Sequence, residues 1–131
     1  MKLSTRSRYG TRMVLDLAKR FNEGPVRIRD IADREGISVK YLEQLIIPLK
    51  KANFIKSVRG PKGGHMLSRH PKDITVGEVV RALEGGMNFT DCVGSPDTCE
   101  RSPECATRDI WEAASKAMYH KLDSMTLAGL L

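Results

Sequence analysis

The sequence predicts a mainly α-helical fold with one small β-hairpin near its middle. Three observations lead to this expectation. Apolar residues recur at helical spacing along most of the 131 residues, and a glycine-rich turn separates two short apolar runs. A last periodic segment closes the chain. A chain of this length fits one compact unit and can bury roughly 65–70% of its unfolded surface, so it needs neither disulfides nor metal merely to fold.

The first part of the chain reads as three helices. They are expected over residues 5–21, 27–35 and 39–52. Ser4 or Thr5 can cap the first helix and Ser38 the third, and Pro48 is expected to bend or tighten the third. Gly36 makes a sharp break between the second and third helices. Two short helices joined by a tight turn with glycine are typical of a helix-turn-helix.

A β-hairpin is expected directly after these helices. Strands are predicted over residues 54–59 and 65–68, and the glycine-rich residues 60–64 form the turn between them. A basic hairpin that follows a helix-turn-helix is a wing. The sequence therefore predicts a winged helix-turn-helix domain over residues 1–72.

The second part, residues 73–131, is predicted to hold a cysteine loop and a dimerisation helix, packed with the first part as one compact unit. Residues 75–84 read as a short helix ended by two glycines, and residues 87–105 as a loop. The final helix is expected over residues 107–126. Its apolar side chains recur in a heptad-like seam formed by Trp111, Ala114, Met118, Leu122 and Met125.

Charge divides the chain at the same place. Residues 1–72 carry 17 basic and 6 acidic residues, a net charge of +11, whereas residues 73–131 carry 5 and 10, a net charge of −5. Positive charge concentrated on one part marks a surface that meets a polyanion. Since it coincides with the helix-turn-helix, we expect the polyanion to be double-stranded DNA.

The expected DNA contacts lie on the third helix and on the wing. The second helix of such a motif enters the major groove with its N-terminal residues on the base edges. We expect contacts from Ser38, Lys40, Tyr41, Glu43 and Gln44 on the helix, and from Arg59, Gly60 and Lys62 on the wing. The alternative interpretation is an ordinary amphipathic hairpin with a solvated face.

Composition excludes several other classes. No run of 18 apolar residues could cross a membrane, and no apolar segment follows the basic N-terminus as it would in a signal peptide. We therefore expect a cytoplasmic, reducing location. Aromatic residues make up only 5% of the chain, too few for a single-strand stacking platform. No motif pairs a nucleophile with a base, so we expect no enzyme.

Three cysteines lie in the predicted loop, just before the last helix. Cys92, Cys99 and Cys105 have the spacing C-x6-C-x5-C, which does not match the paired knuckles of structural zinc sites. Three thiols on one loop can ligate a soft metal or an iron–sulfur cluster. The helix dipole beside Cys105 favours its thiolate. By spacing alone, a cluster, zinc and a reversible disulfide all remain open.

Four segments carry a family resemblance: "LSTRSRYG", "ISVKYLEQLIIPLKKANFIKSVRGPKGGHML", "TVGEVVRALEG" and the cysteine loop. Together they resemble the bacterial winged-helix transcription regulators that include the iron–sulfur cluster regulator IscR, the nitric-oxide sensor NsrR and the cysteine-metabolism repressor CymR. The resemblance implies a homodimer with swapped long helices that binds a palindromic operator. It also implies that Cys92, Cys99 and Cys105 hold an iron–sulfur cluster, [2Fe–2S] in preference to [4Fe–4S], whose state sets operator choice or affinity.

One departure from the family concerns the fourth cluster ligand. The positions that supply it in relatives hold Arg108, Arg8 and Arg12 here, and arginine has no lone pair to donate. The nearby candidates are Asp91, Asp97, Glu100, Glu104 and Asp109, together with an exogenous ligand. The histidines His65, His70 and His120 are interpreted as wing or surface residues.

Two alternative functions stay open at this point. One is a regulator of the same family without a cluster, controlled by thiol redox, by zinc or by a partner protein. The other is a metal-binding interaction protein whose basic part meets acidic partners in place of DNA.

Overall fold

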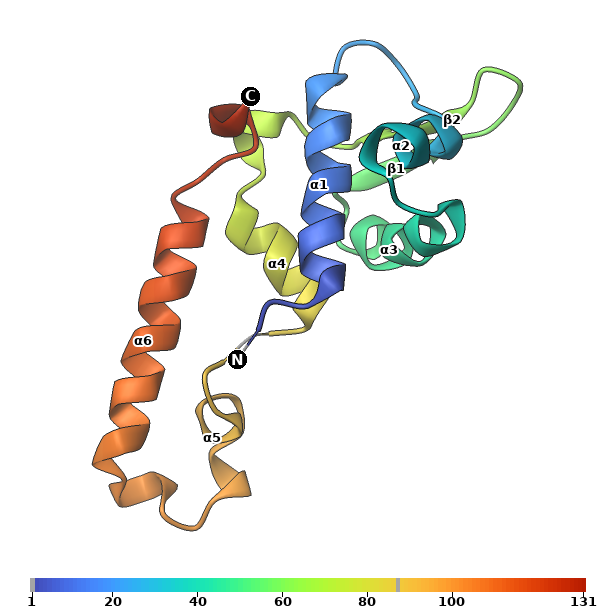
Figure 1. Ribbon diagram of the computed structural model, residues 1–131. Helices are drawn as coiled ribbons and strands as arrows, with labels where there is room; N and C mark the ends of the chain where they lie inside the picture. The colour runs from blue at the N-terminus through green and yellow to red at the C-terminus, as the bar shows by residue number, and fades with distance from the viewer. Residues whose placement is uncertain (1, 87) are drawn as a thin grey trace.

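The computed structural model describes residues 2–86 and 88–131 (Figure 1). Its helices are α1 Thr5–Lys19, α2 Ile28–Glu35, α3 Val39–Lys51, α4 Val76–Glu84, α5 Asp91–Gly94 and α6 Ala106–Asp123. Its strands are β1 Ile55–Val58 and β2 Gly64–Leu67. Single 3₁₀ turns lie at Pro71–Asp73, Pro96–Thr98, Ser102–Glu104 and Ala128–Leu130. Among the described helices, none is long and apolar enough to cross a membrane.

The core lies where α1, α2, α3 and α4 meet the hairpin. Met13, Leu17, Leu42, Leu45 and Leu49 are almost completely buried there. Side chains of α4 join the same cluster, so the core continues past the end of the hairpin. Apolar residues at helical spacing form the inward stripe of each helix, and that burial supplies most of the helical stability.

One buried carboxylate ties α1 to α2. Asp16 is 3% exposed and accepts a bidentate pair from Arg34, at 3.0 and 2.8 Å, and a further bond from Arg20 at 3.0 Å. A buried charge needs such partners, because desolvating it alone is costly. Among the described residues of the basic part, four arginines form ion pairs within the fold. Arg20 and Arg34 pair with Asp16, Arg12 pairs with Glu35, and Arg69 pairs with Glu78.

The helix-turn-helix forms as predicted. Gly36 adopts a left-handed conformation (φ 64°) at the end of α2, and the Ser38 side chain caps α3 by accepting from the Tyr41 N–H at 3.1 Å. Ser4 caps α1 in the same way. Pro48 lies within α3, which continues past it to Lys51.

The wing is a two-stranded antiparallel hairpin in which Ile55 pairs with Leu67 and Val58 with Gly64. A bridge between Val26 and His65 attaches it to the segment before α2. Arg27 donates a hydrogen bond to the Pro61 carbonyl at 2.9 Å and so fixes the turn. Both contacts come from residues just before α2, so the wing is held to that segment near its turn.

The loop of the second half contains short regular elements. Met87 lies outside the described residues, and residues 88–105 contain α5 and two 3₁₀ turns where a continuous loop was predicted. Proline starts both 3₁₀ turns at a first or second position, where its missing N–H costs nothing. Each of these elements is only one turn long, which agrees with the expectation that residues 88–105 hold no long regular structure.

Helix α6 runs alongside α4 and carries the cysteine segment to the end of the molecule farthest from the wing (Figure 1). It ends at Asp123, three residues earlier than expected. The following residues form an extended pair with the segment before α4, in which the Val76 N–H donates to Met125 at 2.8 Å and the Leu127 N–H to Ile74 at 2.9 Å. This pairing and the ion pair between Arg81 and Asp123, at 2.7 Å, anchor the C-terminal end of α6.

Candidate nucleic-acid interface and cysteine segment

The first turns of α3 present polar side chains to solvent. Ser38, Lys40, Glu43 and Gln44 are exposed, whereas Leu42, Leu45, Ile46 and Leu49 on the opposite face are buried. The buried face holds the helix against α1 and α4, so the polar face is fixed in direction before any ligand binds. Such a face can enter a DNA groove without being reordered.

Tyr41 differs from the other residues expected at DNA. Its side chain is half-buried and lies edge-on to Tyr9, with ring centroids 5.9 Å apart, and its hydroxyl is 3.1 Å from that of Thr5. Arg8 and Arg12 lie over the Tyr9 ring. Tyr41 therefore attaches the recognition helix to α1. Sequence reasoning missed this role of Thr5, because the contact joins residues 36 positions apart.

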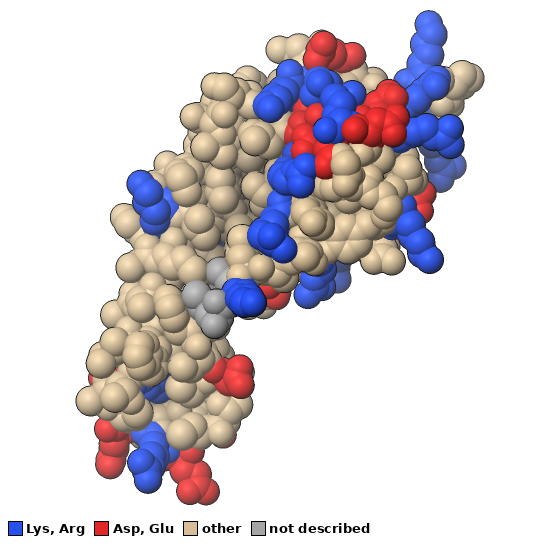
Figure 2. Space-filling view, in the orientation of Figure 1, with Lys and Arg blue, Asp and Glu red and all other residues tan. Residues whose placement is uncertain are grey.

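Basic side chains gather over the helix-turn-helix and the hairpin, while the opposite end of the molecule carries mixed charge (Figure 2). In the described part of the chain Lys40, Arg59 and Lys62 are exposed and take part in no ion pair. Their charges are therefore available to phosphates. Gly60, at the wing tip, adopts a positive φ of 110°, which a side chain at that position would strain.

The three cysteines occupy three successive short elements. Cys92 lies on α5, Cys99 follows the turn Pro96–Thr98, and Cys105 is the N-cap residue of α6. All three are free thiols, and Cys99 is the exposed one. Among the described residues, no three His, Cys, Asp or Glu side chains are close enough to hold a metal ion. The donor set is that of a soft-metal site, but the thiols are not yet gathered.

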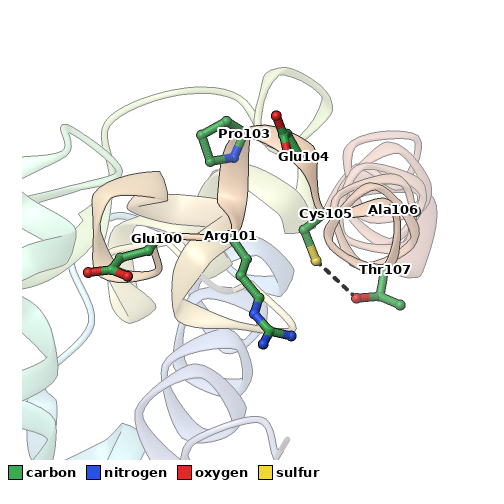
Figure 3. A pocket seen from close by; sticks show the side chains of 7 residues that line it. All are labelled: Glu100, Arg101, Pro103, Glu104, Cys105, Ala106 and Thr107. Atoms are coloured by element: carbon green, nitrogen blue, oxygen red, sulfur yellow. Dashed lines mark hydrogen bonds between the residues drawn. The ribbon is translucent and has the colours of Figure 1, made fainter.

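The Cys105 thiol is hydrogen-bonded at the start of α6. Its sulfur lies 3.1 Å from the Thr107 hydroxyl. That hydrogen bond, together with the backbone N–H groups of Arg108 and Thr107 at the start of α6, lowers the pKa of Cys105. The thiol borders a hollow of about 650 Å³, in which the carboxylates of Glu100 and Glu104 turn away from the sulfur (Figure 3). A lowered pKa favours the thiolate form, which is the form that binds metals and acts as a nucleophile.

Arg108 occupies a position where relatives were expected to supply a ligand, and here it joins two elements. Its Nε donates to the Cys92 carbonyl at 3.0 Å, and its guanidinium lies 3.5 Å from Glu112. The side chain thus connects α5 to the first turns of α6. Its role in the described structure is positional, consistent with its lack of a free lone pair.

The structure places the other candidate ligands outside any cluster. Asp91, Asp97, Glu100, Glu104 and Asp109 are exposed. His65 bonds Ser57 in the wing, and its pKa is lowered by burial and by the charge of Lys50. His70 caps the turn Pro71–Asp73, and His120 is exposed in the last turns of α6.

Much of α6 is uncovered. Ser115 is its only side chain that is buried among the residues described, whereas Ile110 and Trp111 are 56% and 40% exposed. A groove of about 510 Å³ with almost entirely apolar walls runs between α1, α4 and α6. Its lining residues are Leu3, Ser7, Arg8, Thr11, Val76, Val80, Met118 and Leu122.

Comparison with known proteins identifies the family. The model of the Rrf2 family, described as an iron-dependent transcriptional regulator, matches residues 3–131. Protein rrf2 of Nitratidesulfovibrio vulgaris strain Hildenborough is 53% identical over all 131 residues of this chain and 87% of its own length. The chain belongs to the Rrf2 family. It is accordingly a transcriptional regulator, and the relatives bear the names of regulators and not of enzymes.

Solved Rrf2-family structures confirm the winged-helix fold. IscR from T. potens is 43% identical, with a TM-score of 0.81 over 99% of this chain and 85% of that one. CymR, named the global cysteine regulator of B. subtilis, is 38% identical, with a TM-score of 0.82 over 99% and 95%. The predicted resemblance to the IscR and CymR family is thereby confirmed. The individual DNA contacts and cysteine ligands stay predictions.

Proposed function

We propose that this Rrf2-family regulator is a homodimeric repressor that binds a palindromic operator in the cytoplasm, and that an iron–sulfur cluster on its cysteine segment controls binding. The observation that carries the proposal is the fixed, exposed polar face of α3 beside a wing whose Lys62 and Arg59 are unpaired. Residues 1–72 would read DNA, and residues 73–131 would hold the sensor and the dimer contact.

DNA recognition would divide between helix and wing. Glu43 and Gln44, with Ser38, Lys40 and Tyr41 beside them, face the base edges, while Arg59, Gly60 and Lys62 approach the backbone or the minor groove. Phosphate contacts would supply most of the affinity, so binding should weaken steeply with salt.

Dimerisation is supported by the uncovered apolar surface of α6 and by the groove beside it. Ile110 and Trp111 are large apolar residues exposed on one helix, an arrangement that usually marks an interface. Met118 and Leu122 of the same helix line the groove between α1 and α4. A twofold dimer would place two α3 helices on half-sites about 34 Å apart, one turn of DNA.

The cysteine segment would act through the start of α6. Cys92, Cys99 and Cys105 would hold the cluster, [2Fe–2S] in preference to [4Fe–4S], which would supply a redox-sensitive and labile link between the three short elements. Cys105 caps α6 and Arg108 binds the Cys92 carbonyl, so any rearrangement of the segment displaces the first turn of α6. Displacing α6 in a dimer changes the spacing of the two α3 helices.

A second candidate is a regulator controlled by thiol chemistry alone, by zinc or by a partner protein. One observation favours it. A solved relative that is 35% identical, over 99% of this chain and 95% of its own, is described as the oxidized form of CymR from Staphylococcus aureus. The lowered pKa of Cys105 suits such chemistry as well.

Anaerobic purification separates the two candidates. Iron with acid-labile sulfide and a visible absorption spectrum supports the cluster, whereas zinc alone or no metal supports the second candidate. Cys99→Ala should abolish the visible spectrum after anaerobic reconstitution. An unchanged spectrum in that variant removes Cys99 from the ligand set.

A further inference from the structure

Ser102 is a buried hydroxyl in a segment that is otherwise open to solvent. It is 7% exposed, and it is the only side chain classed as buried among described residues 88–106. Among the described residues its Oγ has no hydrogen-bond partner. Burying a hydroxyl without a partner is costly, so its presence calls for a physical reason.

Ser102 lines the same space as one of the thiols. Ser102 and Cys99 line a hollow of about 360 Å³, and Arg108 closes it from α6. The Ser102 N–H donates to the Cys99 carbonyl at 3.2 Å, which folds both residues into one turn. The neighbouring hollow, bordered by Cys105, shares Glu100 and Pro103 with this one. Ser102 therefore lies between the two later thiols.

The spacing points to ligation. Cys99, Ser102 and Cys105 follow the pattern C-x2-S-x2-C. This is the C-x2-C-x2-C spacing that wraps the thiolates of bacterial ferredoxins around a cluster, with serine replacing the middle cysteine. Serine is the oxygen analogue of cysteine, with the same reach from the backbone.

We infer that Ser102 Oγ is the fourth ligand of the cluster that the proposed function places on Cys92, Cys99 and Cys105. The inference rests on that proposed function. On ligation the Oγ–H bond breaks, an Oγ–iron bond forms and the proton passes to solvent, with no change in electron count. The guanidinium of Arg108, which lines the same hollow, compensates the added negative charge.

The carboxylates in reach are weaker candidates. Asp97 and Glu100 line the hollow as well, but both are exposed and fully hydrated, so neither loses anything when no metal is bound. Ser102 alone has a buried polar atom that ligation would satisfy. An oxygen donor is harder than a thiolate and would leave the cluster more labile than a four-thiolate site.

The test compares full-length Ser102→Ala and Ser102→Cys with wild type and with Ser95→Ala. Ser95 is an exposed serine of the same segment, and its hydrogen bonds to described residues use only its backbone, so it controls for loss of a hydroxyl. Each protein is reconstituted anaerobically with enriched iron and sulfide. The readouts are iron content, the Mössbauer spectrum, the absorption spectrum and the rate of iron loss to a chelator, with circular dichroism to verify folding.

We expect the wild-type Mössbauer spectrum to contain an iron site with mixed oxygen and sulfur ligation, and Ser102→Cys to convert it to an all-sulfur site with shifted absorption. Ser102→Ala should lose iron on the order of 10-fold faster or more, and Ser95→Ala should match wild type. Unchanged spectra in both Ser102 variants, or the expected changes appearing in Asp97→Ala or Glu100→Ala in their place, overturn the inference. If wild type takes up no iron and sulfide, the proposed function itself fails.

Discussion

The winged half of this molecule, residues 1–72, and the cysteine segment, residues 88–106, differ in how many side chains they bury. In the winged half, α1, α2 and α3 bury a continuous core, and a salt-bridged Asp16 is sealed inside it. In residues 88–106 Ser102 is the only side chain classed as buried, and its hydroxyl is unsatisfied. The winged part is stabilised by its own packing, whereas residues 88–106 bury few side chains of their own.

This difference matches the proposed division between a DNA-binding part and a part that controls binding. The polar face of α3 is fixed by the core behind it, so a single chain already presents the residues that we propose to face DNA. The cysteine segment is held by few contacts, such as the bond from Arg108 to the Cys92 carbonyl. Segments with few buried contacts have low local stability and are the ones that switches use. A metal, a disulfide or a partner could therefore rearrange the cysteine segment without unfolding the winged helix-turn-helix.

The largest expected effect tests this contrast in stability. Leu42→Ala should lower the free energy of unfolding by about 2–5 kcal/mol, because it leaves a cavity in a core position that is 0% exposed. Val93→Ala in the cysteine segment, the matched control, should change it by less than about 0.5 kcal/mol. Urea denaturation of the metal-free protein measures both. Equal losses would mean that the two halves form one equally packed unit.

The next effect sharpens the role of the reading face. Gln44→Ala should cost about 1–3 kcal/mol on the cognate site and relax sequence preference, because a base-edge contact is lost. Arg59→Ala should weaken binding about equally on all sequences and lower the salt slope by about one. Fluorescence anisotropy on cognate and scrambled duplexes distinguishes the two. A uniform loss in Gln44→Ala would move that residue from base readout to the backbone.

A smaller effect concerns the attachment of α3 to α1. Tyr41→Phe removes the hydroxyl that lies 3.1 Å from Thr5, and should cost about 0.5–1 kcal/mol of stability. Thr5→Val should cost a similar amount, and the double variant should cost no more than either alone, because both remove one bond. Thermal unfolding of the four proteins provides the cycle. Fully additive losses would show that the two hydroxyls act separately.

The smallest effect is a pH dependence at the C-terminal end of α4. Burial alone would raise the pKa of Glu84, but hydrogen bonds from Ser4 and Ser7, at 2.5 and 2.6 Å, outweigh it and leave the pKa lowered. A carboxylate with a lowered folded-state pKa adds stability above its unfolded-state pKa, and that stability is lost as pH falls through the folded-state value. Glu84→Gln should therefore flatten the acid limb of the stability curve, measured by urea denaturation between neutral and acidic pH. An unchanged acid limb would contradict this assignment.

Local sequence signals predicted the winged half well, because its helices and turns are marked by capping residues and glycines within their own segments. Ser4 and Ser38 cap α1 and α3 as predicted. Gly36 ends α2 in the left-handed conformation that the tight turn requires. The hairpin follows from its glycine-rich turn. The helix ends were less predictable: α6 stops at Asp123 because the following residues pair with the segment before α4, which no local pattern reveals.

The candidate site was predicted only in its chemistry. Three cysteines on one segment predict a soft-metal or redox site from their residue type. The contacts that position them depend on residues distant in the sequence. The bond from Arg108 to Cys92 and that of Tyr41 to Thr5 join residues far apart in the chain. Ser102 was overlooked because a serine in a polar loop looks ordinary until its burial is known, although its spacing from Cys99 and Cys105 was visible in the sequence.

DNA binding by cluster-loaded and metal-free protein tests the division into reader and control segment most directly. Anaerobically purified protein is titrated, in both forms, against a duplex selected from a random pool, at several salt concentrations. We predict steeply salt-dependent binding with a Kd that differs between the two forms. Failure of both forms to bind duplex DNA at low salt would contradict the assignment of α3 and the wing, and identical Kd values would contradict control by the cysteine segment.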